Sequence, residues 1–339
     1  MSGTILLTGA AGYIASHTWL ALQAAGFAVV GLDNFSNSSP EVLARLATLS
    51  GGTPDFVRAD TRDAAALDAL FGSRRIDAVV HFAAHKAVGE STSQPLRYYA
   101  NNIGGLLTLA QAMDRHGCKA LVFSSSATVY GKPESLPIRE DAALSATNPY
   151  GATKLMGENI LRDLQLADAA WRVALLRYFN PVGAHESGLI GEDPRGIPNN
   201  LMPYITQVAC GKRARLQVFG DDYDTPDGTG VRDYIHVLDL AEGHVAALRH
   251  LLDAGRSITA NLGTGRGYSV LELVRAFERA SERPVPYDVV ARRPGDIDAC
   301  YADATLARDV LGWQAGRGID AMCVDSWRWQ SRNPDGFGA

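Results

Sequence analysis

The chain has 339 residues and a mass of 36.3 kDa, which is enough for about two domains. Apolar residues make up 46% and charged residues 20%, so a sizeable core is expected and disordered, collagen-like and coiled-coil classes are excluded. The net charge of −5 argues against a surface for nucleic acid or an anionic membrane.

Cysteine and histidine usage argues against metal sites and a disulfide framework. Cys118, Cys210, Cys300 and Cys323 are far apart and form no CxxC pair, which fits a cytoplasmic protein. The histidines include no HExxH pattern, so no metal is expected. No apolar run has the length of a membrane span, and the first run breaks at Gly9, which indicates a strand and not a signal peptide.

Short apolar runs alternate with helical patterns through the first half of the chain. The predicted strands are Thr4–Thr8, Phe27–Asp33, Asp55–Asp60, Asp77–Phe82, Ala120–Ser125 and Arg172–Phe179. The predicted helices between them are Gly12–Ala25, Arg62–Phe71, Pro95–His116 and a helix from about 149 to 166. Alternating β and α units predict an α/β fold with a Rossmann-type, doubly wound parallel sheet.

The character of the sequence changes after Asn180. Gly, Pro, Asn and Asp gather in 181–200 and 220–231, which predicts long loops of the kind that often carry function. Helices are expected near 200–210, 236–252 and 269–281, with a strand at 258–262. We expect a dinucleotide-binding domain over 1–180, to which 234–262 returns, and a smaller α/β substrate-binding region mainly over 181–339.

The first predicted strand runs into a glycine-rich turn and then a helix. Gly9 and Gly12 let the backbone turn tightly and approach a pyrophosphate at the N-terminus of the helix. Ala15 takes the third small position of this dinucleotide fingerprint. Asp33 ends the second strand, where a carboxylate accepts ribose hydroxyls and repels a 2′-phosphate, so the pattern favours NAD over NADP.

Tyr150 and Lys154 form a YxxxK spacing, which places both side chains on one face of a helix. A nearby ammonium is expected to lower the pKa of the tyrosine, so that it acts as a base near neutral pH. Ser126 follows the fifth strand at the carboxyl edge of the sheet, where ligands bind. Its hydroxyl is placed to bond the same substrate oxygen as Tyr150. Asn101, on the preceding helix, is either a structural amide or close to this site.

At this point the chain resembles the extended short-chain dehydrogenase/reductase family and, within it, the UDP-glucose 4-epimerases (UDP-galactose 4-epimerases). The stretches that carry the resemblance are Thr8–Ile14, Leu32–Asn34, His81–Ala83, Lys86–Ser91, Ser124–Gly131, Leu175–Ala184, Gly196–Tyr204, Asp227–Val237 and Arg292–Asp296. They span nearly the whole chain, and the last four are more specific than the glycine turn.

The resemblance implies a tightly held NAD, a UDP-hexose substrate and a place in galactose and carbohydrate metabolism. Tyr150, helped by Ser126, is expected to remove the proton of the sugar 4-hydroxyl while a hydride passes to the nicotinamide. The 4-keto sugar then rotates about its phosphate linkage and presents its other face. The hydride returns to that face. Lys154 is expected to hold the nicotinamide ribose. Relatives are usually homodimers through two long helices, here 95–116 and 149–166.

The resemblance also implies the contacts of both ligands. The residues expected to line NAD are Gly9, Gly12, Tyr13, Ile14, Asp33, Asn34, Asn37, Ser38, Asp60, Thr61, Phe82, Ala83, Lys86, Asn101, Tyr150, Lys154 and Phe179. Those expected to hold the substrate are Ser126, Asn180, Asn200, Leu201, Gln217, Phe219, Arg232, Arg293, Asp296 and Cys300. Two arginines from separate loops suit a diphosphate, and Asp296 suits ribose hydroxyls.

Cys300 is the most informative departure from the family pattern. It aligns with a position beside C2 of the hexose, where members restricted to glucose and galactose resemble one another in carrying Tyr. Members that also accept N-acetylated sugars carry a smaller residue there. The resemblance therefore implies that UDP-N-acetylglucosamine and UDP-N-acetylgalactosamine are also substrates. A second departure, His85, faces either the NAD edge or solvent.

Three other functions remain open at the level of sequence. A nucleotide-sugar 4,6-dehydratase on the same scaffold would need a carboxylate after the strand-five hydroxyl, where this chain has Ala127 and Thr128. A UDP-glucuronate decarboxylase shares the Tyr and Lys pair. A non-catalytic, NAD-binding regulator tends to lose the tyrosine, which this chain keeps.

Overall fold

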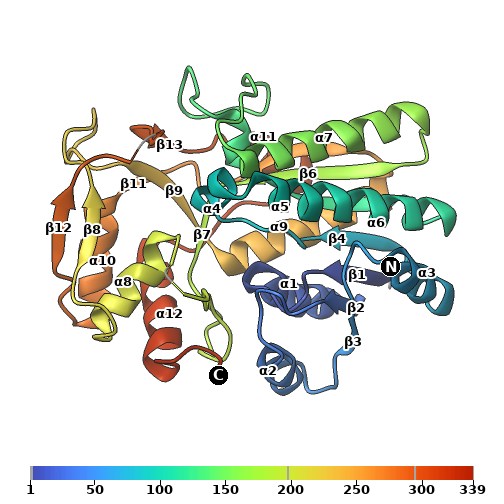
Figure 1. The fold of residues 1–339 in the computed structure, drawn as a ribbon, viewed down its shortest axis with the longest axis horizontal. Helices are drawn as coiled ribbons and strands as arrows, with labels where there is room; N and C mark the ends of the chain where they lie inside the picture. The colour runs from blue at the N-terminus through green and yellow to red at the C-terminus, as the bar shows by residue number, and fades with distance from the viewer. Residues whose placement is uncertain (1–2, 197, 294, 339) are drawn as a thin grey trace.

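The structure is a computed structural model that describes residues 3–196, 198–293 and 295–338. Ile197 and Pro294, which belong to two of the stretches that carry the resemblance, lie outside the described residues. Figure 1 shows a large sheet with helices on both faces and a smaller region of short strands and helices beside it.

The large sheet has seven strands, all parallel, in the order β10-β6-β5-β4-β1-β2-β3. The strands are β1 (Thr4–Thr8), β2 (Ala28–Asp33), β3 (Asp55–Arg58), β4 (Ala78–His81), β5 (Ala120–Ser126), β6 (Arg172–Tyr178) and β10 (Ile258–Leu262). The order reverses between β1 and β4, and such switch points are where doubly wound sheets bind ligands. The predicted fold class is confirmed, and we call this sheet with its helices the Rossmann half.

Helices cover the two faces of this sheet. One face packs under α1 (Tyr13–Ala24), α2 (Glu41–Ser50) and α9 (Val237–Arg249), whose apolar side chains join one core cluster with the strands. The other face packs under α3 (Ala64–Ser73), α6 (Gly104–Arg115) and α7 (Pro149–Ala167). The inner strands β1, β4, β5 and β6 are buried on both faces, which explains why they are largely apolar in the sequence, whereas the edge strand β3 has no fully buried residue.

The predicted helix over 95–116 is interrupted. A short helix, α5 (Pro95–Tyr98), runs into the π-helical segment η1 (Tyr99–Ile103) and then into α6. A π turn inserts an extra residue into the helical ladder, and such turns often occur at functional sites. A second π segment, η3 (His250–Ala254), ends the helix predicted over 236–252. Periodicity alone does not distinguish a π turn from an α-helix, so the sequence did not predict either interruption.

The smaller region, which we call the C-terminal half, is built from short pieces. Its strands are β7 (Asn180–Val182), β8 (Leu216–Phe219), β9 (Val231–His236), β11 (Gly267–Ser269), β12 (Tyr287–Val290) and β13 (Ala299–Cys300). Its helices α8 (Leu201–Ala209), α10 (Val270–Ser281) and α12 (Ile319–Arg332) enclose a core of their own. β9 pairs with β7, β11 and β13, and β8 pairs with β12.

The remaining short helices connect these parts. α4 (Val88–Ser93) follows the loop after β4, and the 3-10 turn η2 (Ala127–Tyr130) follows β5. α11 (Thr305–Leu311) packs against β10 and α9, so a late segment of the chain also touches the Rossmann half. Within the described residues no helix is long and apolar enough to cross a membrane.

Candidate active site

The turn after β1 is shaped for a close approach. Gly9 has a φ of +68°, and a Cβ added there would stand 2.9 Å from the amide nitrogen of Ala83. α1 begins one residue after Gly12, and no side chain caps its N-terminus. The first amides of α1 are thus free to meet an anion, in line with the fingerprint read from the sequence. Ala15 is buried against the sheet, as the third small position requires.

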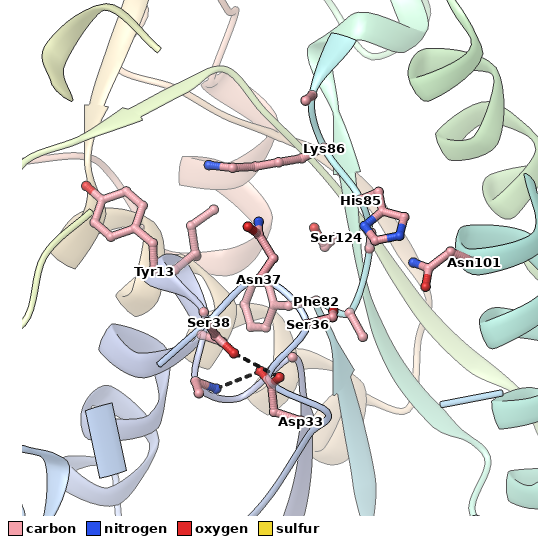
Figure 2. Close-up of a pocket in the computed structure, with 18 of the residues that line it drawn as sticks. Tyr13, Asp33, Ser36, Asn37, Ser38, Phe82, His85, Lys86, Asn101 and Ser124 are labelled. Carbon is pink, nitrogen blue, oxygen red and sulfur yellow. Dashed lines mark hydrogen bonds between the residues drawn. The ribbon is translucent and has the colours of Figure 1, made fainter. Parts of the chain in front are cut away.

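Asp33 organises the loop after β2, as Figure 2 shows. One carboxylate oxygen accepts the amide of Phe35 at 2.8 Å and the hydroxyl of Ser38 at 3.0 Å, and the other accepts the amide of Ala11 at 3.1 Å. A carboxylate offers about four acceptor positions, so one remains for a ribose hydroxyl. The side chain therefore fits the nucleoside role expected of it.

A cavity of about 450 Å³ opens over the carboxyl ends of β1, β2 and β4. The predicted cofactor residues that line it are Gly9, Gly12, Tyr13, Ile14, Asp33, Asn34, Asn37, Ser38, Asp60, Thr61, Phe82, Ala83, Lys86, Asn101, Tyr150 and Lys154. Phe179, which the resemblance placed near the nicotinamide, is not among the residues that line this cavity, and its contact with NAD stays a prediction. β6 ends at Tyr178, whose side chain takes the place at the wall, while Phe179 packs into a separate apolar cluster with Tyr130 and Ile138.

Asparagines on the η1 segment connect the cavity to α7. Asn101 lines the cavity, and Asn102 accepts the amide of His85 at 2.8 Å and donates to its carbonyl at 3.0 Å. Asn102 also donates to Thr153 Oγ1 at 3.0 Å. The ring of His85 lies at the cavity wall and faces Tyr98, and burial lowers the pKa of His85. The sequence left the place of this histidine open, and the structure puts it at the wall.

α7 begins immediately before the predicted tyrosine. Asn148 caps the helix by accepting the amide of Gly151 at 2.9 Å, and Pro149 takes the first helical position. Lys154 is buried one turn later, where its Nζ donates to the carbonyl of Ser124 at 2.6 Å. Its Nζ lies 5.9 Å from the centre of the Tyr150 ring. The helix therefore brings Tyr150 and Lys154 to the end of β5.

Ser126 lies at the end of β5, where its hydroxyl acts to lower the pKa of Tyr150. Its oxygen also accepts the amide of Thr128 at 3.2 Å and the hydroxyl of Thr128 at 3.0 Å, so it caps η2. Ser126 is not itself among the residues that line the cavity, although its partner Tyr150 is. The predicted catalytic residues are thus joined through Tyr150.

The expected lowering of the tyrosine pKa by Lys154 is not found in this structure. Burial raises the pKa of Tyr150, and the group that lowers it is the hydroxyl of Ser126. The physical reason is that Lys154 points to a backbone carbonyl, and burial lowers the pKa of Lys154 itself to about 7. With a pKa of about 7, Lys154 carries only part of its charge near neutral pH, so it does little to favour the phenolate.

Reasoning from sequence missed several residues at the cavity wall. Tyr178 lines the cavity, and its hydroxyl donates to Ser124 Oγ. Glu192 accepts from Lys86 Nζ at 2.9 Å and from Asn200 Nδ2 at 2.7 Å. Arg195 donates to the carbonyls of Ser36 and Ser38. Only the loop composition of 181–200 pointed to Glu192 and Arg195, because no spacing identifies side chains that reach across a cavity.

Five of the ten predicted substrate residues gather apart from this cavity. Arg293 Nε donates to Asp296 at 2.9 Å and its guanidinium lies 4.7 Å from the centre of the Phe219 ring. Arg232 lies 4.0 Å from Asp296 and donates to the carbonyl of Ile297 at 3.0 Å. Cys300 is the register partner of Arg232 between β13 and β9. These side chains form a cluster that we call the arginine cluster.

The other predicted substrate residues are dispersed. Asn200 lines the cavity, and Leu201 begins α8 and packs on the C-terminal core. Asn180 begins β7, and Gln217 is exposed on β8. Apart from Asn200, the predicted substrate residues do not line the cavity, and the two arginines are paired with Asp296. Among the described residues, no group of three or more His, Cys, Asp or Glu side chains is arranged to hold a metal.

Comparison with known proteins gives a consistent result. Residues 5–263 match the family described as the NAD dependent epimerase/dehydratase family. The UDP-glucose 4-epimerase of Bacillus subtilis (strain 168) is 60% identical over 333 residues, covering 98% of each chain. The structure of the Bifidobacterium longum UDP-glucose 4-epimerase in complex with NAD+ and UDP is 53% identical, with a TM-score of 0.94, over 98% of this chain and 99% of that one.

A third relative is named for two kinds of sugar. The UDP-Glc/GlcNAc 4-epimerase of Campylobacter jejuni is 36% identical, with a TM-score of 0.85, over 97% of this chain and 99% of that one.

Proposed function

The chain belongs to the NAD dependent epimerase/dehydratase family, and we propose that Ser126, Tyr150 and Lys154 carry its chemistry. The protein is an isomerase that inverts C4 of UDP-hexoses, interconverting UDP-glucose and UDP-galactose with NAD as cofactor. The observation that supports these roles is that one helix, α7, brings both Tyr150 and Lys154 to the cavity wall, beside the end of β5 that carries Ser126.

The residues around the cavity fit NAD. The Gly9 turn leaves no room for a Cβ, the N-terminus of α1 is uncapped, and Asp33 keeps an acceptor position. When bound, NAD takes a hydride from C4 of the sugar and gives it back. Gly9, Gly12 and Tyr13 would hold the pyrophosphate side, Asp33 the adenosine ribose, and Lys154 the nicotinamide ribose. We propose the other cavity residues named above as further cofactor contacts.

Tyr150 moves the proton in this proposal. As the phenolate, its oxygen takes the proton from the sugar 4-hydroxyl, and the resulting phenol later returns a proton to the same sugar oxygen. Because burial raises the pKa of Tyr150, the phenolate is disfavoured in this structure, and deprotonation requires an added positive charge nearby. Bound NAD supplies a cationic nicotinamide ring, and its ribose gives Lys154 a partner other than the Ser124 carbonyl.

The arginine cluster is proposed as the UDP site. Arg232 and Arg293 come from β9 and from the loop before β13, so they can grip a diphosphate from two sides. Asp296, which both arginines now approach, would accept the uridine ribose. The two ligands are therefore divided between two parts of the chain. Residues 1–180 and 234–262 bind NAD, and the rest of 181–339 mainly binds the UDP-sugar. The return of β10 to the large sheet supports that division.

A Tyr150→Phe variant tests the catalytic assignment. We expect it to retain bound NAD and to lose at least about 100-fold in kcat, because the phenolic proton acceptor is gone. Tyr204→Phe, on α8 and outside the cavity lining, is the matched control and should keep its turnover. Unchanged turnover in Tyr150→Phe would remove this residue from the mechanism. A 6-deoxy-4-keto product seen by NMR would instead favour a dehydratase.

N-acetylated substrates are a second proposal, supported by the size of Cys300. Its side chain lies beside Arg232 in the arginine cluster and is half-buried. Cys lacks an aromatic ring that would fill the space beside C2 of the hexose, and one relative is named for both Glc and GlcNAc sugars. We expect turnover of UDP-N-acetylglucosamine that Cys300→Tyr abolishes and Cys300→Ser preserves. Absence of this turnover in the wild-type enzyme would refute the proposal.

We also propose a homodimer in the cytoplasm, acting in galactose metabolism. Leu96 on α5 is 81% exposed, Leu107 on α6 is 42% exposed and Met156 on α7 is 44% exposed, which leaves apolar side chains on both expected interface helices. The four cysteines are unpaired, which suits a reducing compartment. Sedimentation should give twice the chain mass, and Leu96→Asp with Met156→Asp should give the monomer. A monomeric wild-type enzyme would exclude the dimer.

A further inference from the structure

A third side chain shares the face of α7 that carries Tyr150 and Lys154. Glu158 follows Lys154 by one helical turn and is completely buried. Its neighbour Gly157 lets the helix lie against β5, because a Cβ there would stand 2.6 Å from the Phe123 ring. The reactive face of α7 is therefore pressed onto β5 just beyond Lys154.

The carboxylate of Glu158 connects three elements. Ser125 on β5 donates its hydroxyl to Oε1 at 2.5 Å. Arg177 on β6 forms a bidentate salt bridge with Glu158, in which Nε donates to Oε1 at 2.9 Å and Nη2 donates to Oε2 at 2.7 Å. Arg162, one turn further along α7, donates to Oε2 at 2.6 Å. Burial alone would favour the neutral acid, but these donors hold the pKa of Glu158 below its usual value.

Each strand residue in this network stands next to a residue at the cavity. Ser125 lies between Ser124, whose carbonyl accepts Lys154, and Ser126, whose hydroxyl acts on the pKa of Tyr150. Arg177 precedes Tyr178, which lines the cavity. A displacement of Glu158 along β5 would therefore change the placement of Tyr150 and Lys154 relative to both serines.

The network also continues to the turn that follows Ser126. Arg177 donates to the hydroxyl of Tyr130, the last residue of η2, at 3.0 Å, and Tyr130 donates to Asn261 Oδ1 at 2.6 Å. Asn261 lies on β10 and donates in turn to the carbonyl of Ile138 at 2.8 Å. Ser126 is thus held on both sides, through Ser125 before it and Tyr130 after it.

We propose that Glu158 is a positioning residue, whose bonds to Ser125 and Arg177 fix the register of α7 on β5 and so align Tyr150 and Lys154 with the ends of that strand. This inference rests on the roles proposed for Tyr150 and Lys154. Near-attack geometry is sensitive, because a shift of about 1 Å can cost about 100-fold in rate. A merely structural ion pair would stabilise the fold without affecting that alignment.

Glu158→Gln keeps the shape of the side chain and removes its charge. We expect kcat to fall at least about 10-fold, with KM and the NAD content of the purified enzyme within about 2-fold of wild type. The thermal midpoint should also fall, because the buried Arg177 loses its counter-charge. Arg162→Gln is the matched control: it removes the half-exposed partner of the same carboxylate and should leave kcat unchanged.

A double variant separates positioning from stability. Glu158→Gln with Arg177→Met removes both buried charges, so the thermal midpoint should recover while kcat stays low. Recovery of kcat together with the midpoint would overturn the proposal. If the double variant does not fold, Ser125→Ala decides, since it leaves both charges in place. Reduced kcat at unchanged KM then supports the proposal, and unchanged kcat overturns it. Unchanged turnover in Tyr150→Phe would instead refute the proposed function itself.

Discussion

The Rossmann half and the C-terminal half position their functional residues in different ways. In the Rossmann half, side chains at the cavity stand at or just after the ends of parallel strands, as Asp33 and Lys86 do. In the C-terminal half, Arg293 and Asp296 lie on a loop before a two-residue strand. The first arrangement follows from the sheet, whereas the second depends on hydrogen bonds that fix the loops.

This difference indicates where each half should be fragile. A strand end is held by its ladder and by two layers of helices, so the loss of one side chain there changes the cavity and leaves the fold intact. The loops of the arginine cluster depend on a few buried polar groups, and the loss of one such group should release several loop amides at once.

The largest expected effect is at Asp233, a fully buried carboxylate on β9 next to Arg232. It accepts the amides of Thr264, Gly265 and Ala302 at 2.9 to 3.1 Å, and the hydroxyl of Thr264 at 2.6 Å. Asp233→Ala leaves these donors unpaired, so we expect the free energy of unfolding to fall by about 3 kcal/mol or more. Urea denaturation measures this change.

Asp33→Ala is the counterpart in the Rossmann half. The groups that donate to Asp33 lie at the cavity, where water can replace the carboxylate. We therefore expect the free energy of unfolding to fall by only about 1 kcal/mol, together with a reduced NAD content of the purified protein. An equal loss of stability in both variants would contradict the contrast between the two halves.

Acid should act first on the Rossmann half. Burial lowers the pKa of His17 and His81 to about 3 and that of His244 to about 4, and these residues lie on α1, β4 and α9. Since these folded-state values lie below the usual 6.5, the unfolded chain binds more protons and stability is lost as the pH falls below about 6.5. Between pH 6.5 and 5.5 we expect a loss of about 1 kcal/mol for each histidine.

Hydrogen exchange across this pH range shows which half opens. Protection should fall in α1 and α9 before it falls in α8 and α10. His244→Gln should flatten the pH dependence, whereas replacing the exposed His116 by Gln should not. If α10 opens first, the acid sensitivity lies elsewhere than in these buried imidazoles.

The same contrast explains how much could be predicted from the sequence. β1 and β10 were predicted with their observed bounds, and β1 has an apolar run, Ile5 to Leu7, at its centre as buried parallel strands do. β8 and β13 were not predicted, since strands of four and two residues carry no periodicity. At the strand ends, Gly9, Gly12 and Asp33 could be found from their spacing, whereas the other predicted cofactor residues there came from the family resemblance. Glu192 and Arg195 were found by neither route, because they reach the cavity from an irregular loop.

The interactions of Tyr150 and Lys154 were harder to predict than their positions. The spacing of Tyr150 and Lys154 correctly placed both residues on one turn of a helix at the cavity. It did not predict that Lys154 would bond to the Ser124 carbonyl, which depends on the depth of α7 on β5. The side chains that we propose to set this depth, Glu158 and Arg177, had no recognisable pattern, since they are 19 positions apart in the sequence.

A smaller effect is expected in the arginine cluster. Arg232→Ala should raise KM for UDP-hexoses about 10-fold with the NAD content unchanged, because a charge-assisted contact to the diphosphate is worth about 1.5 kcal/mol or more. Arg215, which forms an exposed pair with Asp288 on the neighbouring strands, is the control, and Arg215→Ala should leave KM unchanged. Steady-state kinetics with both variants measures this. A loss of NAD from Arg232→Ala would show that the two halves do not serve separate ligands.

The smallest effects come from two helix caps of similar strength. Asn148 caps α7 in the Rossmann half, and Ser269 caps α10 in the C-terminal half through a capping box with Glu272. Replacing either residue by Ala should cost about 1 kcal/mol of stability. Only Asn148→Ala should also lower kcat, because the first turn of α7 carries Tyr150, whereas the first turn of α10 carries no residue of the cavity. Equal kcat values for these two variants would mean that the start of α7 is held by its contacts with β5 and not by its cap.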